Sequence, residues 1–286
     1  MLERKADLHV HTTASDGRLT PEAVVIEAAS VGLAGIAITD HDTIHGIRPA
    51  MEAGLQTGVT VVPGVEINTD YGKDEIHMLG YYIDMDSPSL NAHLETLRSA
   101  RLERGAEMVK KLNALGLKLS MERVLKIAGK ASIGRPHIAR AIVEAGYAGG
   151  MNGAFGKYLV RGAPGYVPRL KLSAVEAIHI ILEAGGVAVM AHPGNSKHDE
   201  LIPELVSAGM QGIEAAHTDH SSAQRRHYLK LARKYGLLAT GGSDYHGPDM
   251  MKMAAVGHVQ VDMDVVTALR ELAVSTKSEH ASKYSE

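Results

Sequence analysis

The chain has 286 residues, of which 45% are hydrophobic, and a formal net charge of −3. It contains no Cys, which excludes disulfides, thiolate nucleophiles, zinc fingers and iron–sulfur clusters, so any metal must be held by nitrogen and oxygen ligands. No apolar run approaches the roughly 20 residues of a membrane-spanning helix, and we expect a cytoplasmic protein without a membrane partner.

The N-terminal part of the chain alternates strands with helices. A strand that carries His9 and His11 precedes a helix predicted over residues 20–32, whose start Thr20-Pro21-Glu22 supplies an N-cap, a Pro in the first turn and an early acid. Next come a strand at 35–39, a helix at 43–57 and strand segments at 59–62 and 65–67. This order favours an α/β fold with a parallel sheet.

The alternation is interrupted after residue 67. A strand predicted over residues 75–84 follows too closely for a helical crossover. Helical stretches then succeed one another at 87–115, 120–128, 135–145 and 153–159. We predict that residues 87–168 form a helical insertion that caps the active site, and that residues 1–86 and 169–274 form the catalytic barrel.

The strand and helix alternation resumes after the insertion. Helices are predicted at 173–184, 199–208, 221–235 and 265–274, and strands at 187–191, 212–216, 237–240 and 258–261. The polar tail, residues 275–286, is expected to fray.

Imidazole and carboxylate side chains are concentrated at the predicted strand ends. Any single one is more often a turn or capping residue, but active sites of parallel α/β folds are built at the carboxyl ends of strands, and convergence of nine such residues favours a metal site. Six His and three carboxylates exceed what one ion needs, so the pattern indicates two or three divalent ions of Mn, Fe or Zn. The candidate ligands are His9, His11, Asp16, His41, Glu66, His77, His192, Asp244 and His246.

These residues resemble the PHP (polymerase and histidinol phosphatase) family of metal-dependent phosphoesterases. The matching motifs are DLHVHTTASDG at 7–17, ITDHDT at 38–43, GVEI at 64–67, IHMLGYYID at 76–84, AHPG at 191–194 and GGSDYHG at 241–247. The resemblance implies a distorted seven-stranded (β/α) barrel, similar to a TIM barrel, with a trinuclear metal centre. It implies that His9, His11, Glu66 and Asp244 hold one ion, that Glu66 bridges to a second held by His77 and His192, and that Asp16, His41 and His246 hold a third.

Within that family, the chain is most similar to stand-alone enzymes with a helical insertion. These act as nucleoside 3′,5′-bisphosphate phosphatases and as 5′-to-3′ exoribonucleases on short RNA. The resemblance implies a nucleotide or short oligoribonucleotide as substrate, without long duplex nucleic acid. Because metal ions make bound water acidic, we expect hydrolysis by a metal-bridging hydroxide. The resemblance also places Arg101, Arg104, Arg135 and His137 of the insertion on the substrate phosphates.

The charge distribution and three further side chains complete this hypothesis. Residues 98–140 contain eleven Lys or Arg and three Glu, a local net charge of +8, whereas the rest of the chain carries −11. The metals need carboxylates, and the phosphate that approaches them needs cations. Ser15 is a further candidate phosphate contact, and His217 or His246 is a candidate to assist the leaving oxygen.

Three alternatives remain open at this point. A histidinol-phosphate-type or other small-molecule phosphatase would use the same family motifs. An amidohydrolase begins with a similar HxH strand but needs a carbamylated Lys or an equivalent bridge, and Glu66 occupies that place. A non-enzymatic metal- or nucleic-acid-binding accessory module predicts lost ligands or an extended aromatic and basic surface, neither of which the sequence shows.

Overall fold

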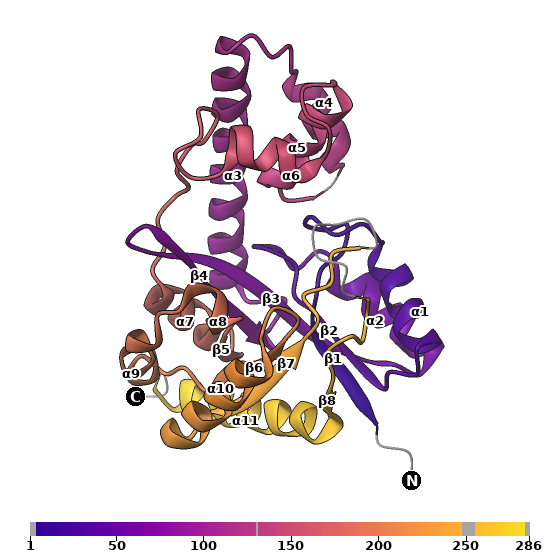
Figure 1. Ribbon diagram of the computed structural model, residues 1–286. Helices are drawn as coiled ribbons and strands as arrows, with labels where there is room; N and C mark the ends of the chain where they lie inside the picture. The colour runs from indigo at the N-terminus through magenta and orange to yellow at the C-terminus, as the bar shows by residue number, and fades with distance from the viewer. Residues whose placement is uncertain (1–3, 130, 248–254, 284–286) are drawn as a thin grey trace.

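A computed structural model describes residues 4–129, 131–247 and 255–283. Strands and helices follow one another largely as predicted (Figure 1). The strands are β1 (Lys5–Val10), β2 (Gly35–Ile38), β3 (Thr60–Tyr71), β4 (Asp74–Tyr81), β5 (Val187–Met190), β6 (Gly212–His217), β7 (Leu238–Gly242) and β8 (Val261–Asp262). The α-helices are α1 (Pro21–Ser30), α2 (Ile47–Thr57), α3 (Pro88–Ala114), α4 (Met121–Ala128), α5 (Arg135–Glu144), α6 (Met151–Ala154), α7 (Ala174–Glu183), α8 (Pro193–Ser196), α9 (Ile202–Ser207), α10 (Ser222–Tyr235) and α11 (Met263–Lys283).

The described strands form one sheet in the order β7-β6-β5-β4-β3-β2-β1-β8. The β1–β2–β3 and β5–β6–β7 pairings are parallel, whereas β4 is antiparallel to both of its neighbours. The sheet curls into a barrel because the chain beyond β7 returns to β1: the Tyr245 carbonyl accepts from the His11 N–H at 2.9 Å, and the Asp244 N–H donates to the His9 carbonyl at 2.8 Å. The predicted α/β barrel is therefore confirmed, and the two-residue β8 lies beside β1 in addition to the seven barrel strands that the family resemblance implies.

This closure brings β7 and β1 unusually close together. A Cβ atom at Gly242 would lie 2.3 Å from the backbone nitrogen of His9. No side chain fits between the two backbones, so Gly is required at this position. The close approach fixes where His9 sits relative to the residues that follow β7.

The interruption predicted after residue 67 is a β-hairpin. The predicted segments 59–62 and 65–67 belong to a single long strand, β3, which pairs with β4 from Gly64 to Tyr71. Pro63 does not break β3 because it faces Ile38, the last residue of β2, where the missing N–H of Pro costs little. The hairpin places Glu66 and His77 on adjacent strands.

The segment between β4 and α7 stands on one end of the barrel (Figure 1). Helix α3 rises from the barrel, and α4, α5 and α6 pack beside its upper part. This segment has a hydrophobic core of its own, which includes Met108, Leu112, Ile138 and Ile142; full burial of each such side chain is worth roughly 1.5–3 kcal/mol. None of the described helices, α3 included, is both long enough and apolar enough to cross a membrane.

The C-terminal helix differs from its prediction. Helix α11 continues to Lys283, through the segment from Ser275 that was expected to fray. Contacts with the barrel explain the extension: Gln211 donates a hydrogen bond to the Thr276 hydroxyl at 3.0 Å, and the stem of Lys277 covers Gly185. The short strand predicted at 258–261 is also shifted, to Val261–Asp262.

Candidate metal centre

All nine predicted ligands converge at one end of the barrel. His9 lies in β1, Glu66 in β3 and His77 in β4, whereas the others follow strands. Among the residues that follow strands at this end of the barrel, Asp42 (51°), His192 (26°) and Asp244 (54°) have a positive φ. Such backbone strain in residues other than Gly is concentrated at functional sites, because it aims side chains where a regular strand cannot.

Glu66 occupies the middle of the cluster. Its Oε1 lies 2.8 Å from His77 Nδ1 and 3.0 Å from His192 Nε2. Its Oε2 lies 2.8 Å from His41 Nδ1, 3.2 Å from His11 Nε2 and 3.4 Å from His9 Nε2. A fully buried carboxylate that faces imidazoles with both oxygens has the geometry of a bridge between cations. Burial raises its pKa, but the charges of His41, His77 and His9 outweigh burial and hold that pKa well below its usual value.

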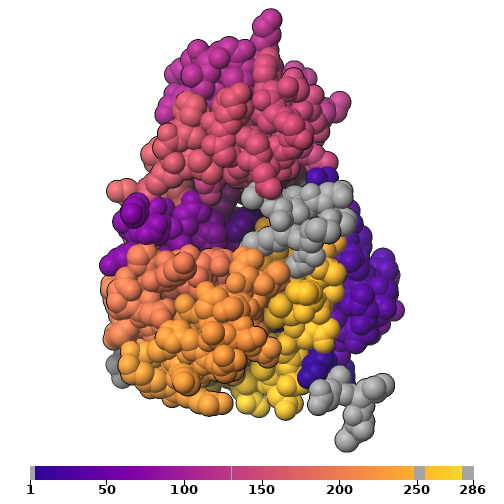
Figure 2. Space-filling view, in the orientation of Figure 1, coloured from indigo at the N-terminus to yellow at the C-terminus, as the bar shows by residue number. Residues whose placement is uncertain are grey.

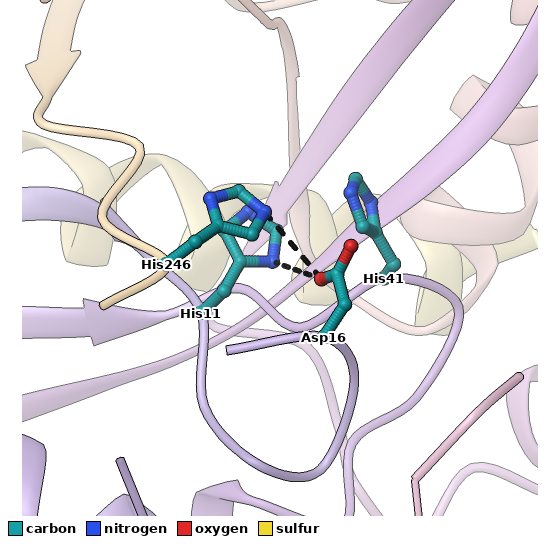
Figure 3. A group of neighbouring side chains, drawn as sticks. All are labelled: His11, Asp16, His41 and His246. Atoms are coloured by element: carbon teal, nitrogen blue, oxygen red, sulfur yellow. Dashed lines mark ion pairs between the residues drawn. The ribbon is translucent and has the colours of Figure 1, made fainter. Parts of the chain in front are cut away.

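Asp16 forms the centre of a second group (Figure 3). Its Oδ1 lies 3.4 Å from His246 Nε2 and 3.9 Å from His11 Nδ1, and the rings of His11 and His246 stack with centroids 4.0 Å apart. Figure 3 shows the carboxylate between His41 and the stacked pair. One ligand atom from each of these four residues lies within 4.8 Å of the others, which suits a single ion.

The remaining groups share members with these two. His9, His11 and Asp244 form one set, His41, Glu66 and His77 form another, and His9, Glu214 and His217 form a third. His9, His11 and His41 therefore each belong to two sets. The implied division of ligands among three ions stays a prediction, because His41 lies against Glu66 as well as against the Asp16 group.

Unpaired buried atoms provide a direct test of whether a metal fits. Burying a polar atom without a partner costs about 1–3 kcal/mol, and more when it is charged. In the described part of the chain, five buried atoms that make no hydrogen bond belong to candidate ligands of this centre: His9 Nε2, His11 Nε2, Asp16 Oδ1, Glu66 Oε2 and His77 Nε2. Divalent cations would satisfy these nitrogen and oxygen atoms, so the donor set fits Mn, Fe or Zn.

The protonation of the imidazoles supports the same conclusion. Burial lowers the pKa of His11, but hydrogen bonds and charge from Asp244 and Glu66 outweigh burial and raise it to about 10; the pKa of His77 is raised to about 9 in the same way, mainly by Glu66. Burial dominates at His192 and lowers its pKa to about 4. Without metal, protons on some imidazoles therefore balance the carboxylates, and a bound metal must displace them.

Metal affinity should consequently fall as the pH falls. For each proton that the metal displaces from a group such as His11, the Kd for the metal should rise roughly tenfold for every pH unit below the pKa of that group. Titration of the metal-free protein with Mn²⁺ at pH 8 and at pH 6 tests this expectation. Equal affinity at the two pH values would show that the imidazoles are already unprotonated and would contradict the pKa assignments.

Glu214 is a site residue that the sequence analysis missed. Its Oε1 accepts a hydrogen bond from His9 Nδ1 at 3.0 Å, and its Oε2 accepts one from the His192 backbone N–H at 2.7 Å. With the proton on Nδ1, His9 presents the lone pair of Nε2 to the centre. The available signal was an acid in the middle of the otherwise apolar run GIEAA.

His246 and His217 differ in which ring nitrogen carries the proton. His246 Nδ1 donates to the Asp244 carbonyl at 2.9 Å, which leaves Nε2 as a lone pair suited to a metal. His217 Nδ1 accepts from the Asp219 N–H at 3.1 Å, so Nε2 carries the proton, and it lies 3.4 Å from Asp244 Oδ2. Of the two predicted acid candidates, His217 is therefore the one that holds a proton toward the centre.

Three aspartates that flank candidate ligands in the sequence mainly organise the backbone. Asp7 accepts from the Ser243 and Gly257 N–H groups, each at 2.8 Å, and Asp40 accepts from the Thr12 N–H at 2.8 Å. Asp42 accepts from the Asn68 N–H at 3.0 Å and pairs with Arg101. These bonds hold the loops that carry the ligands.

The predicted phosphate contacts surround the centre, but each already has a protein partner. Arg101 Nε donates to Asp42 at 2.7 Å, Arg104 Nε to the Val167 carbonyl at 2.8 Å, and Arg135 Nη2 to both oxygens of Glu75 at 3.1 and 3.2 Å. The Ser15 hydroxyl donates to Asp40 at 2.6 Å, and His137 Nδ1 accepts from the Gly134 N–H at 3.0 Å. Among these side chains, Arg104 also has a buried Nη2 without a partner in the described residues. Their phosphate-binding role stays a prediction.

A cavity of about 360 Å³ opens over the centre. It is lined by Glu66, His77, His192 and Asp244 on the barrel side, and Glu75, the partner of Arg135, lies at its edge. Figure 2 shows a hollow where the helical segment meets the barrel. A volume of this size lies within the range of small-molecule sites.

Comparison with known proteins decides the family. Residues 7–181 match the PHP domain. The chain belongs to the PHP family. It is 38% identical to a 3′,5′-nucleoside bisphosphate phosphatase of Chromobacterium violaceum, over 85% of this chain and 87% of that protein. It is 37% identical to the 5′-3′ exoribonuclease Rnm of Escherichia coli, over 85% of each chain.

A solved structure agrees with this assignment. A protein from Bifidobacterium adolescentis assigned as a metal-dependent phosphoesterase superposes with a TM-score of 0.86 at 33% identity, over 93% of this chain and 96% of that one. This PHP protein is thus a metal-dependent phosphoesterase, and so a hydrolase.

Proposed function

We propose that the chain hydrolyses the phosphate esters of nucleotides, namely nucleoside 3′,5′-bisphosphates and the 5′ ends of short RNA, with two or three bound divalent ions. The observation that carries the proposal is the Glu66 carboxylate, which faces five imidazoles from four different parts of the barrel. The substrate class is supported by the two relatives named above and by the cationic side chains of the insertion beside the centre.

The protein side chains divide the work of this reaction. When bound, the ions supply Lewis acids that neutralise phosphoryl charge and make water a nucleophile near neutral pH. Glu66, Asp16 and Asp244 would hold them together with the surrounding imidazoles, and Glu214 orients His9. His217 holds a proton on Nε2, 3.4 Å from Asp244, and would donate it to the leaving oxygen.

A cationic side chain lies beside the cavity to receive the substrate. Arg135 is paired with Glu75, whose carboxylate also lies 3.7 Å from His77 Nε2 and 3.9 Å from Arg169 Nη1. A phosphate that enters the cavity offers Arg135 anionic oxygens in place of those that Glu75 now supplies to its Nη2. Arg135 is thereby available to neutralise the phosphoryl oxygens.

A substrate panel tests the proposal. The Mn²⁺-loaded protein is offered adenosine 3′,5′-bisphosphate, 5′-phosphorylated short RNA, histidinol phosphate and a simple amide, and kcat/KM is measured for each. We expect the two nucleotide substrates to exceed histidinol phosphate by at least tenfold and the amide to be inert. Histidinol phosphate ahead of both nucleotides would contradict the proposed substrate class, and hydrolysis of the amide alone would contradict phosphoester chemistry.

A further inference from the structure

The half-buried His220 lies beside the centre, but both of its ring nitrogens are used by backbone groups. Its Nδ1 lies 3.1 Å from the Ala215 carbonyl oxygen in β6, and its Nε2 lies 3.0 Å from the backbone nitrogen of Gly194 in α8. Because the carbonyl can only accept and the N–H can only donate, the proton is on Nδ1 and the lone pair is on Nε2. His220 is therefore not a candidate metal ligand, and its role must be sought in what its ring connects.

The ring connects a candidate ligand to the side chain that holds a proton toward the centre. Gly194 is two residues after His192, and His220 is three residues after His217. The His220 N–H donates to the His217 carbonyl at 3.0 Å, and the two rings have centroids 5.3 Å apart. The rings of His192 and His217 are likewise 5.3 Å apart. His220 thus ties the loop after β5 to the turn after β6.

The backbone at Gly194 leaves room for the His220 ring and for little else. A Cβ atom at Gly194 would lie 2.7 Å from both Nε2 and Cδ2 of His220, so a larger residue would push the ring away. The same Cβ would lie 2.7 Å from the side-chain nitrogen of Gln224, but that amide is the end of a flexible side chain and can turn aside. Gly194 does not have a positive φ, so its contact with His220 accounts for the Gly.

His192 needs contacts of this kind because its backbone is strained. Its φ of 26° lies outside the range that residues other than Gly ordinarily adopt, and such a conformation persists only where the surrounding structure holds it. Glu214 accepts from the His192 N–H at 2.7 Å, and His220 accepts from the Gly194 N–H two residues later. Loss of the second contact should let the His192 imidazole move relative to the centre.

We infer that His220 is a positioning residue for phosphoester hydrolysis: through Gly194 it holds the His192 imidazole in place as a metal ligand, at a fixed distance from the proton on His217. His220 acts through these two side chains and not on the substrate itself. The inference rests on the metal centre proposed above but not on the proposed nucleotide substrate.

Substitutions of His220 test the inference with the panel compound that the wild-type protein cleaves fastest. We expect His220→Ala to lower kcat by about 10–100-fold, as when a residue that orients a metal ligand is removed, and to change KM by less than about twofold. Titration of the metal-free protein with Mn²⁺ should show at least one binding step weakened by about tenfold. His220→Gln should retain most of the activity and affinity, because its amide oxygen can still accept from the Gly194 N–H.

His93→Ala is the matched control. The exposed His93 also donates from Nδ1 to a backbone carbonyl, that of Ser89 at 2.8 Å, but it lies on α3 and is not among the candidate ligands. Its removal should change neither kcat nor Mn²⁺ affinity. If the wild-type protein cleaves no compound of the panel, the proposed function fails, but the Mn²⁺ titrations still decide the role of His220. An unchanged Mn²⁺ affinity in folded His220→Ala protein overturns the inference.

A double variant separates positioning from a merely structural role. Gly194→Ala should resemble His220→Ala, because the added methyl group displaces the ring. If His220 acts through Gly194, the double variant should lose no more activity than the worse of the two single variants, since both remove one shared contact. Losses that multiply would overturn the inference. Nitrogen NMR of the wild-type imidazoles needs no variant: a proton on Nδ1 of His220 supports the inference, and a proton on Nε2 contradicts it.

Discussion

Glu66→Gln is expected to reduce kcat by more than the roughly 10–100-fold that is usual when a residue only orients a metal ligand. Gln has nearly the same shape as Glu but no charge, and its amide cannot serve two cations at once. The five imidazoles that face Glu66 within 3.4 Å would lose the carboxylate that balances the ions they hold. Bound metal should decrease together with activity, and both are measured on the same sample, by elemental analysis and by phosphate release.

The control for this variant makes the same chemical change elsewhere. Glu52 lies on the exposed side of α2 and is not a candidate ligand, so Glu52→Gln should leave both metal content and kcat unchanged. Circular dichroism of the two variants shows whether the barrel is intact. A Glu66→Gln protein that is folded, holds its full metal content and retains activity would exclude a bridging role for Glu66.

Glu214→Gln is expected to have the next largest effect, a loss of about 10–100-fold in metal affinity or activity. The amide of Gln still fits between His9 and the His192 backbone N–H, but it carries no negative charge to stabilise a charged imidazole. Both neighbours are N–H donors, so the NH₂ group of the amide must point at one of them without forming a hydrogen bond. Titration with Mn²⁺ measures the affinity, and phosphate release measures the activity.

Two outcomes would revise the role assigned to Glu214. Because His9, Glu214 and His217 also offer ligand atoms within 4.8 Å of one another, a loss as complete as that of Glu66→Gln would make Glu214 a ligand itself. Behaviour identical to that of Glu52→Gln would show that His9 needs no orienting partner.

The sequence predicts the barrel and the ligand cluster for a clear physical reason. Each βα unit has an apolar strand, a polar turn and a capped helix, as at Ser173 with Glu176 and at Ser221 with Gln224. These local patterns do not depend on distant contacts. An imidazole directly after such a strand, as at His41 or His192, can therefore be recognised in the sequence because it differs from the residues that usually form these turns.

Features that depend on long-range packing could not be predicted in the same way. Glu214 lies in the middle of a strand and becomes a site residue only because β6 faces His9 across the barrel. The continuation of α11 depends on Gln211 and Gly185, and the strand β3 runs through Pro63 because of where β2 ends. The division of ligands among ions depends on which nitrogen each imidazole presents, and the sequence does not encode this locally.

The partners of the guanidinium groups in the insertion are a further feature that depends on long-range packing. A sequence pattern places Arg101 and Arg135 near a phosphate, but it does not reveal that they pair with Asp42 and Glu75.

Anomalous diffraction from crystals of the Mn²⁺-loaded protein tests the central claim most directly, because it locates each ion without reference to activity. We predict peaks on both sides of the Glu66 carboxylate, within coordinating distance of its two oxygens, and, if a third ion is bound, one beside Asp16. A single peak that Glu66 does not touch, or no peak in the barrel, would contradict the account.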